Sequence, residues 1–222
     1  MSPRGRPRAF DRDEALREAM LLFWENGYEC TSMAELTAAM GIGSPSLYAA
    51  FGSKETLFRE ALALYGATYG SLTTRVLAEE PTARAAVEAM LRGNAADYLR
   101  PDRPTGCMAV LSALNCSHPD VRGFMVDRRR EARELIRRRL RRAIEHGELP
   151  AAADIEAMAA FYHATLMSLS LLARDGATET ELTAVADGAM AAWPGYLASA
   201  SDVRPLVSHL DSADPDPGAS SS

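Results

Sequence analysis

Four histidines are the side chains of this sequence best suited to acid–base chemistry: His118, His146, His163 and His209. None has a nucleophile or a carboxylate at a spacing typical of a catalytic set. The segment "GIGSPS" has the glycines of a phosphate-binding loop, but no strand precedes it, so it lacks the required context. A Gly-x-Ser-x-Gly nucleophile elbow is absent. The pattern predicts that the protein is not an enzyme.

Thiols offer a second kind of chemistry, metal binding. Cys107, Cys116 and His118 carry groups that suit Cu(I) or Zn(II), so a metal-responsive protein is one alternative. Their spacing matches no compact ligand motif, and small buried cysteines explain the pair more simply. With Cys30 the chain has three widely spaced cysteines. We therefore predict no disulfide framework, no metal, no cofactor and a reducing, cytoplasmic location.

The charge balance bears on the class of partner. The 222 residues carry a net charge of −6, so the protein as a whole is not a basic coat for nucleic acid, and contact with a polyanion must be local. The basic N-terminus "MSPRGRPRAF" has no apolar core, so it is not a secretory signal. The uncharged run 157–173 is shorter than the roughly 20 residues that span a bilayer. No membrane association is predicted.

Helix-forming residues recur at helical spacing along the chain, and alternating β-branched runs are absent, which predicts an all-α fold of about nine helices. Glycine, proline and capping residues mark the ends of these helices. We expect helices over 11–26, 31–40, 44–50, 53 to beyond 72, 82–100, 107–115, 119–146, 154–174 and 179–193. The expected domains are a flexible basic arm (1–10), a helix-turn-helix domain (11–58), a helical ligand-binding and dimerisation domain (59–200) and a disordered tail (201–222).

The helix-turn-helix pattern lies between Thr31 and Phe51. Gly41 ends one helix in a tight turn, and Ile42 fills the space between this helix and the next. Leu47 and Phe51, four residues apart, hold the second of the two helices on the core. The opposite face of that helix stays free and consists of Ser44, Pro45, Ser46, Tyr48 and Ala49.

The segment "ALREAMLLFWENGYECTSMAELTAAMGIGSPSLYAAFGSKETLF" resembles the TetR family of bacterial transcriptional repressors. The carriers of the resemblance are Phe23, Gly27, Tyr28, Thr31, Gly41, Leu47, Tyr48, Phe51, Lys54 and Leu57. There are two departures. Gly43 stands where the family usually has a Ser or Thr cap, and Thr37 stands where it tends to have Ala. The DNA sequence preferred by relatives therefore does not transfer to this chain.

The resemblance implies a set of DNA contacts. Tyr48 and Lys54 would bind phosphates, and Thr31 would do so from a helix N-terminus. Ser44, Pro45, Ser46 and Ala49 would face base edges, where hydroxyls can donate or accept and apolar groups can pack on thymine methyls.

The N-terminal arm supplies the positive charge that this segment lacks. Arg4, Arg6 and Arg8 lie in "PRGRPR", which resembles the core of an AT-hook, a minor-groove binder. The alternative is a plain solvated basic tail that attracts phosphates without sequence preference.

The second domain has no compact motif, and its function is inferred from the kinds of side chain on its helices. By resemblance it binds a ligand and dimerises, and large adaptable side chains on its middle helices could line a pocket for an apolar small-molecule effector. These are Met90, Tyr98, Cys107, Met108, Leu111, Phe124, Phe161, Tyr162, His163 and Met167. The arginine-rich run 127–148 is interpreted as a solvated helix face, and a second DNA site or an anionic-ligand gate there has little support.

The last two helices are uncharged enough to pair with those of a second subunit, giving a homodimer that reads a pseudo-palindromic double-stranded operator. The predicted function is a repressor that a small-molecule inducer releases from its operator. The alternatives are a metal-responsive regulator of the same fold and a non-specific architectural DNA binder, against which the overall acidity argues.

Overall fold

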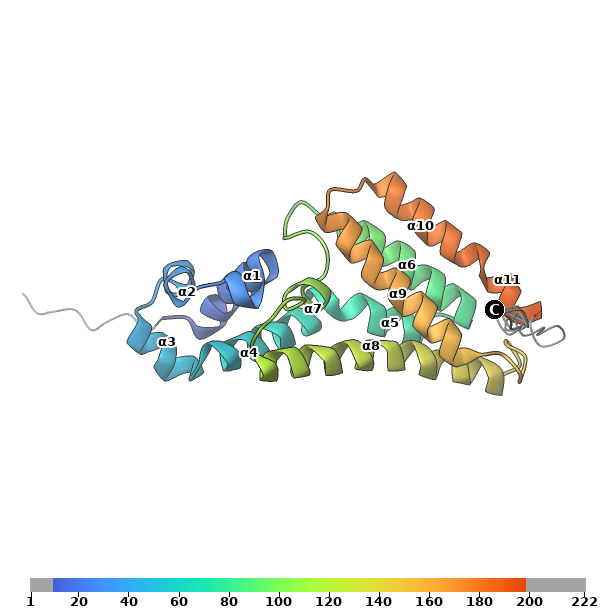
Figure 1. Ribbon diagram of the computed structural model, residues 1–222, viewed down its shortest axis with the longest axis horizontal. Helices are drawn as coiled ribbons and strands as arrows, with labels where there is room; N and C mark the ends of the chain where they lie inside the picture. Colours follow the sequence, from blue (N-terminus) through green and yellow to red (C-terminus); the bar gives the residue numbers. More distant parts are fainter. Residues whose placement is uncertain (1–9, 199–222) are drawn as a thin grey trace, which may run out of the picture.

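The computed structural model describes residues 10–198. Within this range the secondary structure is helical and contains no strand, as predicted. The first three helices form a compact group, which we call the three-helix unit: α1 (Arg12–Cys30), α2 (Met33–Met40) and α3 (Ser44–Phe51). In Figure 1 this unit lies at one end of an elongated molecule.

Local sequence signals account for the ends of these helices. The Asp11 carboxylate accepts hydrogen bonds from the backbone N–H groups of Asp13 and Glu14 and so caps α1. Ser32 and Glu35 form a reciprocal capping box at the start of α2. Gly41 ends α2 with a left-handed φ of 65°. The predicted stop near residue 27 is also present, because Gly27 has φ 77° and ψ 169° and kinks the end of α1.

The fourth helix ends earlier than predicted. Helix α4 spans Lys54–Ala67, and a 3-10 turn η1 (Tyr69–Ser71) separates it from α5 (Leu72–Glu79). The Thr68 hydroxyl donates to the carbonyl of Leu64 at 2.7 Å, so it bonds the backbone within the last turn of α4. The expectation of one helix continuing past Leu72 is therefore wrong.

The remaining helices form the body of the molecule. They are α6 (Ala83–Asp97), α7 (Met108–Leu111), α8 (Pro119–Glu145), α9 (Ile155–Arg174), α10 (Glu179–Ala191) and α11 (Trp193–Ala198). Helix α8 runs along one long side of the molecule, and α6, α9 and α10 lie over its second half (Figure 1). The helices exceed the predicted nine because the long fourth helix is divided and a short α11 follows α10.

Two hydrophobic cores hold these helices together. One core lies among α5, α6, α8, α9 and α10. The other joins the three-helix unit and α4 to Met108, Cys116 and Met125 of the body. The predicted domain boundary at residue 58 falls inside α4, so this single rigid helix belongs to the three-helix unit at its start and to the body at its end.

Helix α9 is long and apolar enough to cross a bilayer by length and composition alone. Core helices of water-soluble proteins pass the same test. Its buried residues, among them Met158, Tyr162 and Leu169, pack into the first core described above. The other side of α9 carries exposed apolar residues, among them Phe161 and Leu171.

Candidate nucleic-acid interface and effector cavity

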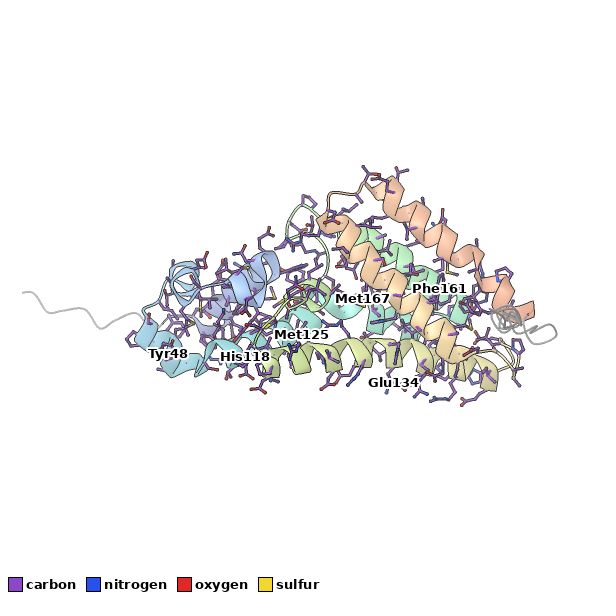
Figure 2. All side chains as sticks on the ribbon, in the orientation of Figure 1. Tyr48, His118, Met125, Glu134, Phe161 and Met167 are labelled. Carbon is purple, nitrogen blue, oxygen red and sulfur yellow. The ribbon has the colours of Figure 1, made fainter. Side chains whose placement is uncertain are left out.

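Helix α3 presents two different faces. Leu47 and Phe51 are buried and anchor it on the second core. The residues predicted to face DNA are all exposed, namely Ser44, Pro45, Ser46, Tyr48 and Ala49. Tyr48 is 51% exposed, high for an aromatic side chain. Figure 2 places it at the tip of the molecule, remote from Phe161 and Met167 in the body.

The N-terminus of α3 begins with a glycine cap and a proline in its first turn. Gly43 occupies the cap position and has no side chain to accept a hydrogen bond from the first turn. Pro45 lies in that turn, where its fixed φ suits a helix and its missing N–H leaves one donor fewer to satisfy. The free N–H groups of this turn therefore remain available to an external acceptor such as a phosphate.

The structure corrects the role predicted for Thr31. This residue is fully buried, and its hydroxyl donates to the carbonyl of Gly27 at 2.7 Å. The adjacent Ser32 is exposed and caps α2 instead. The Thr31 side chain is thus part of the core under the α1 kink and is out of reach of a phosphate. Ser32, and not Thr31, is the exposed residue at the N-terminus of α2.

Lys54 lies at the start of α4, close to the C-terminal end of α3. Its ammonium lies 4.4 Å from the centroid of the Tyr28 ring, a cation–π contact. Burial lowers the pKa of Lys54, and nearby Glu29 acts in the opposite direction. The contact holds the ammonium at one place on the tip of the molecule.

A second cation, which the sequence did not indicate, lies beside α3. Arg12 donates to the carbonyl of Ala50 at 3.3 Å and pairs with Glu60 at 2.7 Å. Its guanidinium also lies 4.3 Å from the centroid of the Phe51 ring. No local pattern signals this position, because residues 12 and 50 meet only in the folded chain. Arg4, Arg6 and Arg8 lie outside the described residues.

A cavity of about 280 Å³ lies in the body, and we call it the effector cavity. Four of the ten predicted ligand-binding residues line it: Tyr98, Cys107, His163 and Met167. The rest of its apolar wall comes from α4, α7, α8 and α9, including Leu62, Val110, Leu135 and Leu166. The cavity is thus bounded by α4, which also carries Lys54 at its start.

The other six predicted ligand-binding residues do not line the effector cavity. Met90, Met108 and Tyr162 are fully buried in the two cores. Phe124 packs under the guanidinium of Arg59 at 4.3 Å, and Phe161 is 37% exposed on the outer side of α9. Leu111 is half-buried on α7. Large apolar side chains at helical spacing mark helix faces, and most of these faces are filled by packing.

Polar groups occupy one part of the cavity wall. The Tyr65 hydroxyl donates to Cys107 Sγ at 3.2 Å, and burial raises the pKa of both groups. The Asn94 amide donates to the carbonyl of Met90 at 2.7 Å and contacts the Thr73 hydroxyl at 3.1 Å. These groups are neutral, and each already has a partner.

Charged groups occupy another part of the wall. Arg128, Arg129, Glu131 and His163 line it, and Arg128 pairs with Glu131 at 2.9 Å. Burial lowers the pKa of His163, and the arginines 129 and 133 add to the effect. The prediction that run 127–148 forms a solvated face therefore fails at Arg129, which lines the cavity, although its neighbours Arg128 and Arg130 are exposed. The sequence could not signal this, since it does not say where packing leaves space.

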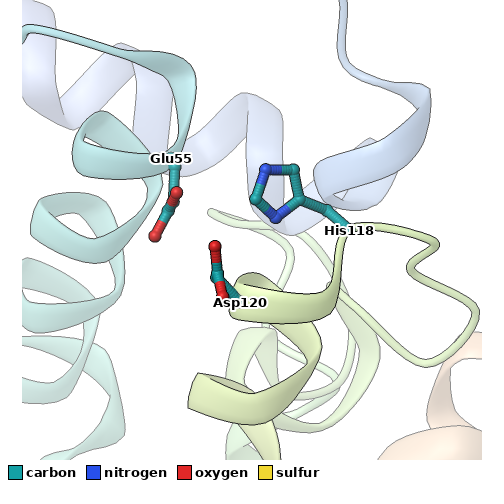
Figure 3. A group of neighbouring side chains, drawn as sticks. All are labelled: Glu55, His118 and Asp120. Carbon is teal, nitrogen blue, oxygen red and sulfur yellow. The ribbon is translucent and has the colours of Figure 1, made fainter.

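The three residues proposed to bind metal are not brought together. Cys107 bonds to Tyr65, while the Cys116 thiol points to Glu29 Oε2 at 3.3 Å, with a pKa raised by burial. Instead, His118 lies near Glu55 and Asp120, with one ligand atom of each within 4.8 Å of the others (Figure 3). Glu55 is also paired with Arg59 at 2.8 Å, so one of the carboxylates already has a cationic partner.

Comparison with known families decides the class of this helix arrangement. Residues 15–61 match the family described as "Bacterial regulatory proteins, tetR family", and residues 83–189 match "Tetracyclin repressor-like, C-terminal domain". The chain belongs to the TetR family. It is a helix-turn-helix transcriptional regulator.

Matches to individual members of the TetR family cover most of this chain. The HTH-type transcriptional repressor ComR of Escherichia coli (strain K12) is 32% identical over 194 residues, covering 86% of this chain and 92% of ComR. The repressor BdcR of the same organism is 37% identical over 123 residues, or 55% of this chain and 61% of BdcR. A structure of the TetR family regulator CifR with a 26-bp operator is 47% identical, with a TM-score of 0.81, covering 85% of this chain and 100% of that one.

Proposed function

We propose that this TetR-family protein is a repressor that binds a pseudo-palindromic operator as a homodimer and that a small-molecule inducer releases it. The observation that carries the proposal is the shared position of α4. Its first residue, Lys54, lies beside α3, and Leu62, Tyr65 and Gly66 near its end line the effector cavity. One rigid helix therefore touches both the DNA-reading end and the space for an effector.

The proposed DNA contacts follow from the exposed face of α3. Ser44 and Ser46 bond to base edges, and Pro45 and Ala49 pack against thymine methyls. Tyr48 and Lys54 bind phosphates and set the position of α3 in the major groove. The arm with Arg4, Arg6 and Arg8 adds attraction and favours A·T-rich flanks.

The proposed dimer forms through α9 and α10. Phe161, Leu171 and Leu172 are exposed on α9, and Ala184 and Gly188 are exposed on α10. Small residues allow close approach of helices, and the apolar side chains need cover. A two-fold axis at this face would place the two α3 helices in successive major grooves, about 34 Å apart.

Release by an effector needs two states that differ in the spacing of the α3 helices. The effector cavity has two walls connected to the three-helix unit. One is α4. The other is α7, and the carbonyl of Ser112, the residue directly after it, accepts a 2.6 Å hydrogen bond from the Tyr28 N–H of α1. An effector that prefers a different placement of α4 and α7 weakens DNA binding, and DNA weakens effector binding equally.

The relatives support repression rather than activation, because ComR and BdcR are both named repressors and CifR is seen on operator DNA. The proposed role is regulation rather than turnover, in the cytoplasm where the operator is. Selection of bound fragments from sheared genomic DNA by the purified full-length protein tests the proposal. We expect a few sites that share an inverted repeat. Uniform recovery of the genome would contradict it.

A further inference from the structure

We propose that the effector is an amphipathic carboxylate, with an apolar body in the effector cavity and its charged end on Arg129. This inference rests on the proposed function, since it names the class of molecule that the same cavity takes. It differs from the apolar effector predicted from the sequence, because it assigns a cation of the cavity wall to the ligand.

Arg129 differs from its neighbours on α8. Arg128 pairs with Glu131 at 2.9 Å, and Arg130 pairs with Asp127 at 3.3 Å. Arg129 lies between them, half-buried in the cavity wall. Its Nη1 atom is buried and has no hydrogen-bond partner among the described residues. A guanidinium carries its charge at all ordinary pH values, so this donor stays charged and unsatisfied.

An unsatisfied buried donor on a charged group is costly, and an anion that enters the cavity removes the cost. A carboxylate fits best, because its two oxygens match the fork of a guanidinium. Burial lowers the pKa of Arg129, as expected for a cation without a counter-ion. The cavity wall thus lacks a negative charge to balance the guanidinium of Arg129.

The surroundings of Arg129 favour an anion over a cation. Glu131 is the only carboxylate among the described residues that line the cavity, and it is already paired with Arg128. His163 faces the same space from α9, and Arg133 is close enough to lower its pKa further. A cationic ligand would meet two arginines here, whereas an anion would meet at least one free donor.

The remainder of the cavity selects the body of the ligand. Leu62, Val110, Leu135, Leu166 and Met167 form an apolar surface away from the charged groups. The volume of about 280 Å³ is at the low end of the range of ligand pockets. A short aliphatic or aromatic carboxylate has the matching shape and polarity, and octanoate and phenylacetate are suitable probes.

The test measures binding of these two probes to the full-length protein by calorimetry without DNA, and in parallel their release of a selected operator. Octanamide and phenylacetamide are the neutral counterparts. We expect the carboxylates to bind about tenfold to a hundredfold more tightly than the amides, as a charge-assisted hydrogen bond requires. Arg129→Gln should remove this difference, and the control Arg130→Gln should keep it.

Three outcomes are decisive. Equal binding of acids and amides, no binding of either acid, or an unchanged preference in Arg129→Gln would each overturn the inference. Arg129→Lys keeps the charge and should keep part of the preference, which separates a lost contact from a damaged fold. Failure to select any operator while the acids still bind through Arg129 would contradict the proposed function alone.

Discussion

Lys54 is the only lysine in the sequence, and it lies where a phosphate contact is proposed. The Tyr28 ring fixes its ammonium at 4.4 Å, so little side-chain freedom is left to lose on binding DNA. Tyr48 extends from α3 on the same end of the molecule and is 51% exposed. In the proposed complex, these two donors of different strength contact the sugar-phosphate backbone.

Lys54→Ala should weaken operator and random DNA alike, because a phosphate contact carries no sequence information. The slope of log affinity against log salt should become less steep by about one per subunit. Anisotropy titrations at several salt concentrations measure this slope. Arg75→Ala, which removes an exposed arginine of α5 in the body, should leave it unchanged. The same slope in both variants would refute the Lys54 contact.

Tyr48→Phe removes one hydroxyl and keeps the ring. We expect the affinity of the dimer to fall about thirtyfold on every duplex, as for the loss of one hydrogen bond of about 1 kcal/mol in each of the two subunits. The salt slope should not change, because no charge is lost. An affinity loss confined to one operator sequence would show that Tyr48 reads a base instead.

His163 makes the stability of the body depend on pH. Burial lowers its pKa in the fold, while in the unfolded chain the pKa is near 6.5. The unfolded state therefore binds the proton more readily, and stability is lost as the pH falls from 7.5 through 6.5 towards the folded pKa. Urea unfolding should show this loss in the wild type and in His146→Gln, whose histidine is exposed, but not in His163→Gln. An identical pH dependence in all three would contradict the assignment.

Helix α8 shows how differently arginines of one helix can be placed. Arg130 is exposed, Arg137 pairs with Glu134 and Glu156, and Arg139 is buried with 3% side-chain exposure. The chain after α8 folds back so that Glu148 reaches Arg139 at 3.4 Å and also accepts the N–H of Ala83 at the start of α6. One carboxylate thus joins α6 to α8.

Removing that carboxylate should destabilise the body. Glu148→Ala leaves the Arg139 charge buried and α6 without a partner for its first N–H, which costs about 3–5 kcal/mol. Urea titration gives the free energy of unfolding. Glu134→Ala breaks a more exposed pair on the same helix and should cost less than about 1 kcal/mol. Similar losses of unfolding free energy in the two variants would mean that the buried pair stabilises the protein no more than the exposed pair does.

The helices were largely predictable because their signals are local. Ser53 and Thr82 cap α4 and α6 as the sequence indicates, and Gly41 ends α2. The break at Thr68 was missed because apolar residues keep helical spacing through it, at Tyr65, Tyr69 and Leu72, although two glycines flank it. Thr31 and Ser32 are neighbouring hydroxyl residues, and it is the burial of Thr31 in the tertiary fold that leaves Ser32 to cap α2.

The site was predictable only in part, for the same reason. The outward face of α3 follows from the buried positions Leu47 and Phe51, since a helix that buries one stripe exposes the other. The effector cavity depends on where packing fails to fill space, which spacing does not encode. Met90 and Met167 look alike in the sequence, yet one is fully buried and the other lines the cavity.

At the scale of the whole molecule, the proposed dimer makes a clear prediction. Leu171→Glu places a charge on the exposed apolar side of α9 and should give monomers by light scattering, with operator affinity reduced at least a hundredfold. Leu114→Glu changes an equally exposed leucine, 49% against 48%, outside α9 and α10. It should stay dimeric. A dimeric Leu171→Glu protein would place the interface elsewhere.

Specific recognition of one operator by α3 is the central claim, and competition for that operator tests it most directly. Labelled operator bound to the full-length protein is titrated at fixed salt with unlabelled operator or with random duplex of equal length. We predict that the operator competes about a thousandfold better than the random duplex, as expected for specific readout of base edges. Equal competition by the two duplexes would contradict the claim.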